Sequence, residues 1–595
     1  MTELLKPSLI EMPMFADADR NALAAIDAET EWFSVPAGWP LFEAGEAADG
    51  MWFLVTGSMA AFAPAQKNHA MLGYVRPGQP IGEMALLARE AHSASVYAMR
   101  DSELLRIPAA AFERLMQTQP RILEPLARLM VARMRENNRA HPRRAPRVYA
   151  LISTSPTIDL ALRARTLQTA LRRLGKRAVI IGEEAAGMSS AWFDALEHDN
   201  DAVFLISPIA DTPWFRACLR QADRIWVLAR ADARPSTPLL PVESTSPARR
   251  FRFVDVLLLH HGMERQAATT EEWRMSCDAA RLFHWRRLDD EDAARLARII
   301  AGRSIGLVLS GGGARAYAHL GVIRALREAG IPFDVCGGTS MGAIVAACLA
   351  KGWSDDEIEL RIRKAFVESN PLGDYVMPVV ALSAGKRVED RLQEHFGETL
   401  IEDLNIPFFC VSTNLVSSTP YVHRAGLLRH ALRATISLPG ILPPVVHGPD
   451  RLLVDGAVLR NFPVDVLKEL HHGPIIGVDV ARRDGINPAD FSDPPNFVGW
   501  VAAHGWQSAP PIASLLMRTA TLAVDPWEGR SNADVLITPE MPGIDLRAWK
   551  SFDDAVASGY SATVTALQSP HGLFTSPAEA DAAAFAASAL LEAAE

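Results

Sequence analysis

Two glycine-rich turns, one strand apart, constrain the fold of this chain more than any other feature. The turn "SGGGAR" follows the apolar run 305–309, and the turn "GGTSMG" follows the apolar run 331–336. Helix-forming residues dominate 316–329 and 341–350, directly after the turns. This order predicts a βαβ unit. Its two turns should meet at one sheet edge, because the carboxyl ends of neighbouring parallel strands lie side by side.

The second turn matches the pattern G-x-S-x-G, with Ser340 between Gly338 and Gly342. In a strand-turn-helix context this pattern is typical of a nucleophilic serine. The two glycines relieve crowding at a strained turn, so that the hydroxyl can project beside helix amides. We therefore predict that Ser340 is a nucleophile. A chance match in a tight turn is the alternative.

The first turn offers backbone N–H groups at the start of a helix, an arrangement that suits an oxyanion or a phosphate. Gly311, Gly313 and Ala316 also fit the dinucleotide pattern G-x-G-x-x-[GA], and Asp334 follows about 20 residues on. Asp334, however, is predicted inside the second strand, whereas a ribose would be met at the strand tip, where Ser340 stands. The oxyanion interpretation is therefore favoured over a dinucleotide site.

A serine hydroxyl is a poor nucleophile at neutral pH and needs a base. Asp455 follows a short apolar run and precedes Gly456, so that its carboxylate should project from a strand end. Desolvation there would raise its pKa toward a useful value. His471 and His472 would complete the chain order of an ordinary triad, but they lie in "KELHHGPIIGV", where exposed helix capping is expected. Asp455 is thus the predicted base, and a β-turn aspartate is the structural alternative.

The N-terminal part reads as short β segments over residues 14–110 and a long amphipathic helix over 109–138, which predicts a β-roll closed by helices. The stretches "FEAGEAADGMWFLVTGSM" and "GEMALLAREAHSASVYAMRDSELLRIP" resemble a cyclic-nucleotide-binding domain. The resemblance implies a phosphate-binding turn opened by Gly82 and Glu83.

In that family an arginine precedes the small-hydroxyl/Ala pair, but here His92 precedes Ser93. A neutral imidazole lacks the guanidinium fork that grips a phosphate. Two interpretations therefore stay open: a cyclic-nucleotide site at Gly82, Glu83, His92 and Ser93, or a structural or regulatory module.

Between these regions, apolar strand-like runs at 147–154, 176–182 and 201–207 alternate with helical stretches such as 160–174. This alternation predicts an α/β layer with a parallel sheet, serving as a scaffold because it has no glycine-rich phosphate loop. The predicted order is a cyclic-nucleotide-binding-like domain (14–138), a linker (139–147), an α/β middle domain (148–300), a catalytic domain (304–570) and an Ala-rich tail (571–595).

Composition narrows the function classes. A chain of 595 residues is too long for one core. The net charge of -10 argues against a general nucleic-acid binder. The five cysteines are scattered and lack zinc spacing, which indicates a reducing, cytoplasmic compartment. No window reaches the ~18 apolar residues of a membrane span, so any membrane contact should be peripheral.

Taken together, "SGGGARAYAHLGV", "GTSMG" and "DGA" resemble the patatin-like phospholipases. "RQAD", "LLLHHG" and "RATISLPGILPPV" narrow the resemblance to the neuropathy target esterase type of lysophospholipase. The resemblance implies an α/β fold, with a three-layer α/β/α catalytic domain after a β-roll domain and an α/β middle domain. It also implies a Ser-Asp dyad rather than a triad.

Carried over to this sequence, the resemblance makes Ser340 the nucleophile and Asp455 its base. It gives the oxyanion hole to the backbone amides of Gly311, Gly312 and Gly313. Arg315 would orient the loop, attract a lipid phosphate or pair with a carboxylate.

The implied reaction is hydrolysis of a carboxylic ester in a lysophospholipid or phospholipid through an acyl-enzyme, with no cofactor or metal. The apolar stretches 376–385 and 437–446 could line an acyl channel, meet a membrane surface or simply pack. The family usually has glycine where Ala316 stands. Ala316 and His92 keep open a regulatory or scaffold protein with an idle hydrolase domain, and a dinucleotide-binding oxidoreductase is the other rival.

Overall fold

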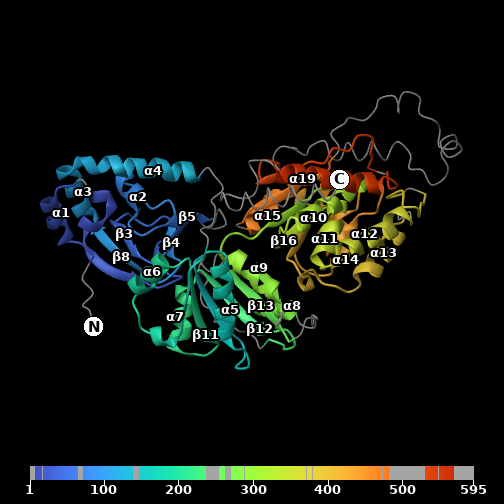
Figure 1. Ribbon diagram of the computed structural model, residues 1–595. Coiled ribbons are helices and arrows are strands. Elements are labelled where there is room, and N and C mark those ends of the chain that lie inside the picture. Colours follow the sequence, from blue (N-terminus) through green and yellow to red (C-terminus); the bar gives the residue numbers. More distant parts are fainter. Residues whose placement is uncertain are drawn as a thin grey trace. The chain divides into compact units, whose positions relative to one another are not determined.

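The chain forms two compact units, Met1–Ala301 and Gly302–Glu595 (Figure 1). The computed structural model describes residues 7–16, 18–64, 71–137, 146–235, 253–261, 270–286, 289–369, 372–377, 379–471, 473–481, 530–546 and 548–568. Most of the predicted linker 139–147 and all of the predicted tail 571–595 lie outside these residues.

The first unit begins with a β-roll, as predicted. Its two antiparallel sheets have the strand orders β1-β8-β3-β6 and β2-β7-β4-β5. The strands are β1 (Glu31–Val35), β2 (Pro40–Phe42), β3 (Gly50–Thr56), β4 (Met59–Phe62), β5 (Met71–Val75), β6 (Pro80–Ile81), β7 (Ser95–Ala98) and β8 (Ser102–Pro108). The helices are α1 (Arg20–Asp27), α2 (Glu83–Ala88), α3 (Ala109–Thr118) and α4 (Leu123–Asn137).

The single long helix expected over residues 109–138 is wrong in one respect, because it is interrupted. α3 ends at Thr118, a short 3-10 turn covers Pro120–Ile122, and α4 follows. Proline has no N–H to donate and disfavours a helical conformation in the residue before it. Gln119 accordingly leaves the helical region, with φ -130° and ψ 65°.

The first unit continues as an α/β domain with a parallel sheet, again as predicted. Its strand order is β10-β11-β9-β12-β13-β14. The strands are β9 (Val148–Ser153), β10 (Ala178–Ile181), β11 (Ala202–Pro208), β12 (Arg224–Arg230), β13 (Phe253–His260) and β14 (Arg281–Arg286). Helices α5 (Leu160–Arg173) and α9 (Asp290–Ile300) pack on one face. Helices α6 (Ser190–Asp199), α7 (Pro213–Gln221) and α8 (Thr270–Ser276) pack on the other. Burial on both faces explains the continuous apolar strands.

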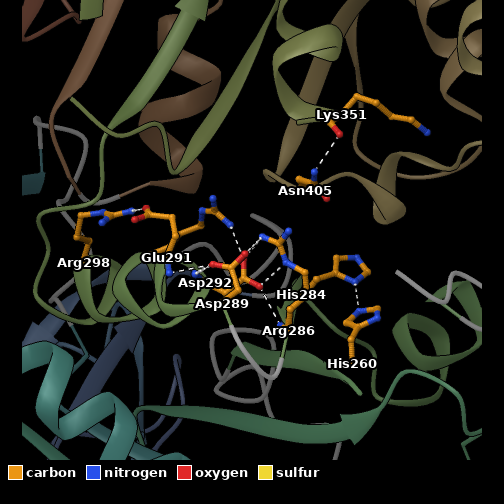
Figure 2. A network of polar contacts seen from close by, with 10 residues as sticks. His260, His284, Arg286, Asp289, Glu291, Asp292, Arg298, Lys351 and Asn405 are labelled. Atoms are coloured by element: carbon orange, nitrogen blue, oxygen red, sulfur yellow. Dashed lines mark hydrogen bonds and ion pairs between the residues drawn. The ribbon is translucent and has the colours of Figure 1, made fainter. Parts of the chain in front are cut away.

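Polar side chains of β13, β14 and α9 form a set of hydrogen bonds in the first unit (Figure 2). Nε2 of His260 and Nδ1 of His284 are 2.9 Å apart, and both rings are buried. The Arg286 guanidinium donates to both carboxylate oxygens of Asp292, at 2.8 and 2.9 Å.

Figure 2 also shows a contact within the second unit, where the Asn405 side-chain amide donates to the Lys351 carbonyl at 2.9 Å. These contacts stabilise the local fold.

The second unit is built on a mixed sheet in the order β19-β20-β17-β16-β15-β21-β22, with β18 paired to β17. β17, β16, β15, β21 and β22 are parallel, while β18 and β20 run antiparallel to β17. The strands are β15 (Gly306–Leu309), β16 (Val335–Thr339), β17 (Phe408–Asn414), β18 (Thr419–His423), β19 (Val445–Val446), β20 (Leu452–Asp455), β21 (Ile475–Val478) and β22 (Val535–Ile537).

Helices cover both faces of this sheet, giving the predicted three layers. α15 (Val464–Leu470) packs on one face against Val308 and Phe409. The other face carries the larger core, which includes Leu307 and Leu309. The helices that contribute to this core are α10 (Ala318–Glu328), α11 (Ser340–Ala350), α12 (Asp355–Ile362), α13 (Lys386–Phe396), α14 (Leu428–Thr435) and α19 (Phe552–Leu567).

α10 and α19 lie against each other, although more than 200 residues separate them in sequence (Figure 1). A Cβ at Gly321 would collide with the Val556 carbonyl, and one at Gly559 would collide with the Ala318 carbonyl. Glycine at both positions therefore permits the two backbones to approach closely. None of the described helices combines the length and the hydropathy that a membrane span requires.

Candidate active site

The two glycine-rich turns meet at one edge of the sheet, as the βαβ pattern predicts. β15 and β16 are parallel neighbours, with Leu309 opposite Gly338. A Cβ built on Gly311 would lie 3.0 Å from the Cβ of Ser340, and one on Gly342 would collide with the Ser310 carbonyl. The serine turn is thus pressed against the glycine loop.

Ser340 is the first residue of α11 and has a φ of 53°. This left-handed conformation is costly for any residue with a Cβ, and it persists only where the surroundings hold it. It is the strained strand-to-helix turn expected for a nucleophile elbow. Ser340 is buried, with 8% of its surface exposed.

Asp455, at the end of β20, lies directly beside this serine. The Ser340 hydroxyl donates to Asp455 Oδ2 at 2.7 Å, and the Ala457 amide donates to Oδ1 at 2.8 Å. The carboxylate is fully buried. Burial raises the pKa of Asp455 to about 7, although the hydrogen bonds from Ala457 and Ser340 oppose the shift. A carboxylate with this pKa can both accept and return a proton near neutral pH.

The three loop glycines differ in what their amides do. The Gly311 N–H donates to the Asn461 carbonyl at 3.2 Å, and the Asn461 side-chain amide returns a bond to the Gly311 carbonyl at 3.2 Å. Among the described residues, the amides of Gly312 and Gly313 have no hydrogen-bond partner. Gly313 has a φ of 54°, and a Cβ there would collide with the Leu546 carbonyl. Within the described residues, the Gly311 amide is thus already occupied, which leaves two of the three predicted loop donors unpaired.

Arg315 connects the glycine loop to two segments that lie much later in the sequence. Its guanidinium donates to the carbonyls of Val480, Met541 and Ile544 at 2.9, 3.0 and 2.9 Å. The adjacent Ala316 is fully buried within a 3-10 turn, Gly313–Tyr317, which precedes α10. The loop therefore accommodates the methyl group that distinguishes Ala316 from glycine.

His471, from the triad interpretation, and Asp334, from the dinucleotide interpretation, lie at the other end of the strands. His471 is buried, not solvent-exposed as expected. Its Nδ1 lies 3.3 Å from Oγ of Ser304, just before β15. Asp334 lies just before β16, not inside it, and its carboxylate accepts the Ile305 N–H at 2.9 Å. Both positions are at amino ends of strands, whereas Ser340 follows a carboxyl end. His472 lies outside the described residues.

Three supporting residues at the site were not predicted: His319, Thr435 and Asn461. His319 is fully buried, and its Nε2 lies 2.9 Å from the Ser310 carbonyl. Burial lowers its pKa to about 4, so that the ring is neutral and Nε2–H can donate to this carbonyl. Thr435 accepts the Ser340 N–H at 3.0 Å. Only the "RATISLPG" stretch, noted for its resemblance, could have drawn attention to Thr435.

The candidate nucleotide residues of the β-roll are only partly gathered. Gly82 has a φ of 82° and caps α2, and a Cβ on it would lie 3.3 Å from His92 Cε1. Glu83 is buried and forms an ion pair with Arg133 of α4. Ser93 is exposed. The negative charge of Glu83 is therefore already balanced by Arg133.

His92 packs as an aromatic residue. Its ring stacks on Phe42, with ring centroids 3.6 Å apart and an interplanar angle of 10°, and it also contacts Trp52. Burial lowers the pKa of His92, although Asp49 and Glu46 oppose the shift. A neutral, stacked imidazole cannot neutralise a phosphate, so this geometry is that of core packing.

Comparison with known protein families finds three domains in this chain. The patatin-like phospholipase family matches residues 307–468. The cyclic nucleotide-binding domain matches residues 32–119. The neuropathy target esterase family P-loop like domain matches residues 149–286. These three matches confirm the predicted fold class.

Several known proteins are similar to this chain over most of its length. Uncharacterized NTE family proteins of Mycobacterium bovis and Mycobacterium tuberculosis are each 32% identical over 591 residues, covering 95% of this chain and 96% of theirs. The patatin-like phospholipase domain-containing protein 7 of Rattus norvegicus is 27% identical over 546 residues, covering 81% of this chain and 40% of its own. The chain therefore belongs to the NTE family, with a cyclic nucleotide-binding domain and a P-loop like domain before a patatin-like phospholipase domain.

Proposed function

We propose that the second unit hydrolyses carboxylic ester bonds of lysophospholipids or phospholipids, with Ser340 as nucleophile and Asp455 as base. The observation that carries this proposal is the 2.7 Å hydrogen bond from the Ser340 hydroxyl to the buried Asp455 carboxylate. The patatin-like phospholipase domain around these residues supports a lipid substrate.

In the acylation step, Ser340 Oγ attacks the acyl carbonyl carbon while its proton passes to Asp455 Oδ2. The amides of Gly312 and Gly313 stabilise the oxyanion, and each such donor is typically worth ~10²–10³ in turnover. When the tetrahedral intermediate collapses, the ester C–O bond breaks. Asp455 then gives the proton to the departing alkoxide oxygen.

In the deacylation step, Asp455 acts as a base a second time. It accepts a proton from a water molecule that attacks the acyl carbonyl. Collapse of the second tetrahedral intermediate breaks the bond to Ser340 Oγ and releases the fatty acid. The serine oxygen recovers its proton from Asp455.

The two apolar stretches of this unit support peripheral contact with a lipid surface. The Leu382 N–H donates to the Gly440 carbonyl at 2.9 Å, which brings 376–385 beside 437–446. Met377, Val379 and Val446 on these stretches are 86%, 91% and 74% exposed. Exposed apolar side chains on a loop and on the short strand β19 suit insertion between lipid head groups.

The test is covalent labelling of the full chain by a fluorophosphonate probe, together with hydrolysis of lysophosphatidylcholine. We expect Ser340→Ala to abolish labelling and to lower kcat by ~10⁴-fold or more. Ser412→Ala is the matched control, because Ser412 is a buried serine 2.9 Å from a histidine nitrogen, Nε2 of His423. Burial, and more weakly His447, lower the pKa of His423 to about 3, too low for a base at neutral pH.

The control should therefore be labelled like the wild type. If labelling survives in Ser340→Ala and disappears in Ser412→Ala, the nucleophile is Ser412 and not Ser340. Equal hydrolysis by the wild type, Ser340→Ala and Asp455→Asn would instead support the rival in which the hydrolase domain is idle. Tight NAD(P) binding in a titration would support the oxidoreductase.

A further inference from the structure

One short segment hydrogen-bonds to the main chains of both proposed catalytic residues. The Ser340 N–H donates to Oγ1 of Thr435 at 3.0 Å, and the Asp455 N–H donates to the carbonyl of Ser437 at 2.9 Å. Ser340 and Asp455 are 115 positions apart in sequence. The three residues 435–437, at the end of α14, therefore link β20 to the start of α11, which directly follows β16. β16 and β20 do not pair with each other in the sheet.

The segment itself is held firmly. Thr435 and Ser437 are fully buried. The Thr435 hydroxyl donates its single proton to the Val411 carbonyl on β17, which leaves an oxygen lone pair for the Ser340 N–H. Ser437 Oγ donates to the Arg433 carbonyl at 2.7 Å and accepts from the Arg433 guanidinium at 2.5 Å. Thr435 is thus fixed by one additional hydrogen bond and Ser437 by two.

Ser340 needs such support for two reasons. Its left-handed φ of 53° is unfavourable and must be maintained by contacts. Its amide also belongs to the first turn of α11, where N–H groups have no partner within the helix. Thr435 satisfies this buried amide and fixes the backbone from which the hydroxyl projects.

We propose that Thr435 is a positioning residue that, together with the Ser437 carbonyl, sets the distance between Ser340 Oγ and Asp455 Oδ2. This inference rests on the proposed Ser-Asp chemistry. Thr435 contacts the Ser340 main chain and acts on the reaction through Ser340. Because it occupies the Ser340 amide, the oxyanion donors come from the glycine loop instead.

The experiment compares Thr435→Val with Thr435→Ser in the full chain. Valine keeps the shape and loses the hydroxyl, whereas serine keeps the hydroxyl. Thr413→Val is the matched control, because Thr413 is a buried threonine of β17 whose hydroxyl has no hydrogen-bond partner among the described residues. The measurements are kcat and KM on a p-nitrophenyl ester, the rate of fluorophosphonate labelling and the pH profile.

We expect Thr435→Val to lower kcat and the labelling rate by about 100-fold, since a displacement of about 1 Å at a reacting group costs about that factor. KM should stay within about twofold. The hydrogen bond from Ser340 lowers the pKa of Asp455. If Thr435→Val displaces Ser340 and this bond is lost, the pKa of Asp455 should rise and the acid limb of the pH profile should move to higher pH. Thr435→Ser and Thr413→Val should stay within about threefold of the wild type.

Full activity in Thr435→Val would overturn the proposal, and so would equal losses in Thr435→Val and Thr435→Ser. If Thr435→Val does not fold, the comparison of Thr435→Ala with Thr435→Ser isolates the hydroxyl, and equal activities of those two would overturn it as well. A wild-type chain that is not labelled at Ser340 would contradict the proposed function itself. Labelling at Ser340 with no effect at Thr435 would contradict only the positioning role.

Discussion

Two aspartates of this protein are equally buried, but their pKa values are shifted in opposite directions. Asp255, in β13 of the first unit, and Asp455, in β20 of the second, are both fully buried. Burial alone would raise both pKa values. The arginines Arg224 and Arg281 overcome this effect and lower the pKa of Asp255 to about 2, whereas burial prevails at Asp455 and raises its pKa to about 7.

The difference lies in the neighbouring strands. Asp255 stands opposite Arg281 on β14, and Arg224 on β12 donates to both of its carboxylate oxygens, at 3.0 and 2.7 Å. Asp455 has only neutral hydrogen-bond donors, and within the described residues it forms no ion pair with a lysine or arginine. Cations stabilise the ionised form of Asp255, which cannot accept a proton at neutral pH. Their absence leaves Asp455 able to do so.

The strongest way to break this comparison is to remove each carboxylate charge in turn. Asp455→Asn should lower kcat by ~10²–10⁴-fold, which is the usual contribution of a positioned base. Asp255→Asn should leave the kcat of the folded protein unchanged. Ester hydrolysis, normalised to folded protein, measures both. A similar loss in both variants would show that the two aspartates do not differ in function.

For the stability of the fold, the substitution at Asp255 should have a larger effect than the one at Asp455. Asp255→Ala leaves Arg224 buried without its carboxylate, and breaking a buried ion pair typically costs about 3–5 kcal/mol. The first unit should therefore unfold at a lower temperature, which calorimetry of the full chain can follow. Ester hydrolysis per folded molecule is the internal control. An unchanged transition would mean that solvent reaches Arg224 in the native state.

The pH dependence of activity sharpens the comparison further. The ionised form of Asp455 is the base, so kcat/KM should rise about tenfold per pH unit below pH 7 and level off above it. A steady-state pH profile on a neutral ester measures this limb. A midpoint near pH 4 would mean that water solvates the Asp455 carboxylate, so that burial does not raise its pKa.

The smallest expected effect concerns the histidine that a triad would require. His471 lies beside Ser304, at the amino end of β15, and no described contact joins it to Ser340 or Asp455. His471→Ala should therefore change kcat by less than about threefold, apart from a modest loss of stability. Loss of most activity in a folded variant would restore a histidine base and remove the special role of Asp455.

Local sequence patterns predicted much of this protein. The serine elbow, the glycine loop and the strand-end aspartate were recognisable because turn chemistry depends on neighbouring residues. The alternation of strands and helices likewise predicted the parallel sheet of the middle domain. Long-range contacts were missed, including those of Thr435, Asn461 and His319. The helix break at Pro120 was also missed, because apolar periodicity continues across it.

The sequence by itself determined which residue types stand at the ends of the strands, and therefore which chemistry the site can contain. The tertiary structure alone decided that Ser340 Oγ and Asp455 Oδ2 lie 2.7 Å apart. It also decided that Asp255 is buried between two arginines, whereas no described residue places a cation beside Asp455. The strength of a hydrogen bond and the pKa of a buried carboxylate depend on distance and surroundings. Only folding brings those surroundings together.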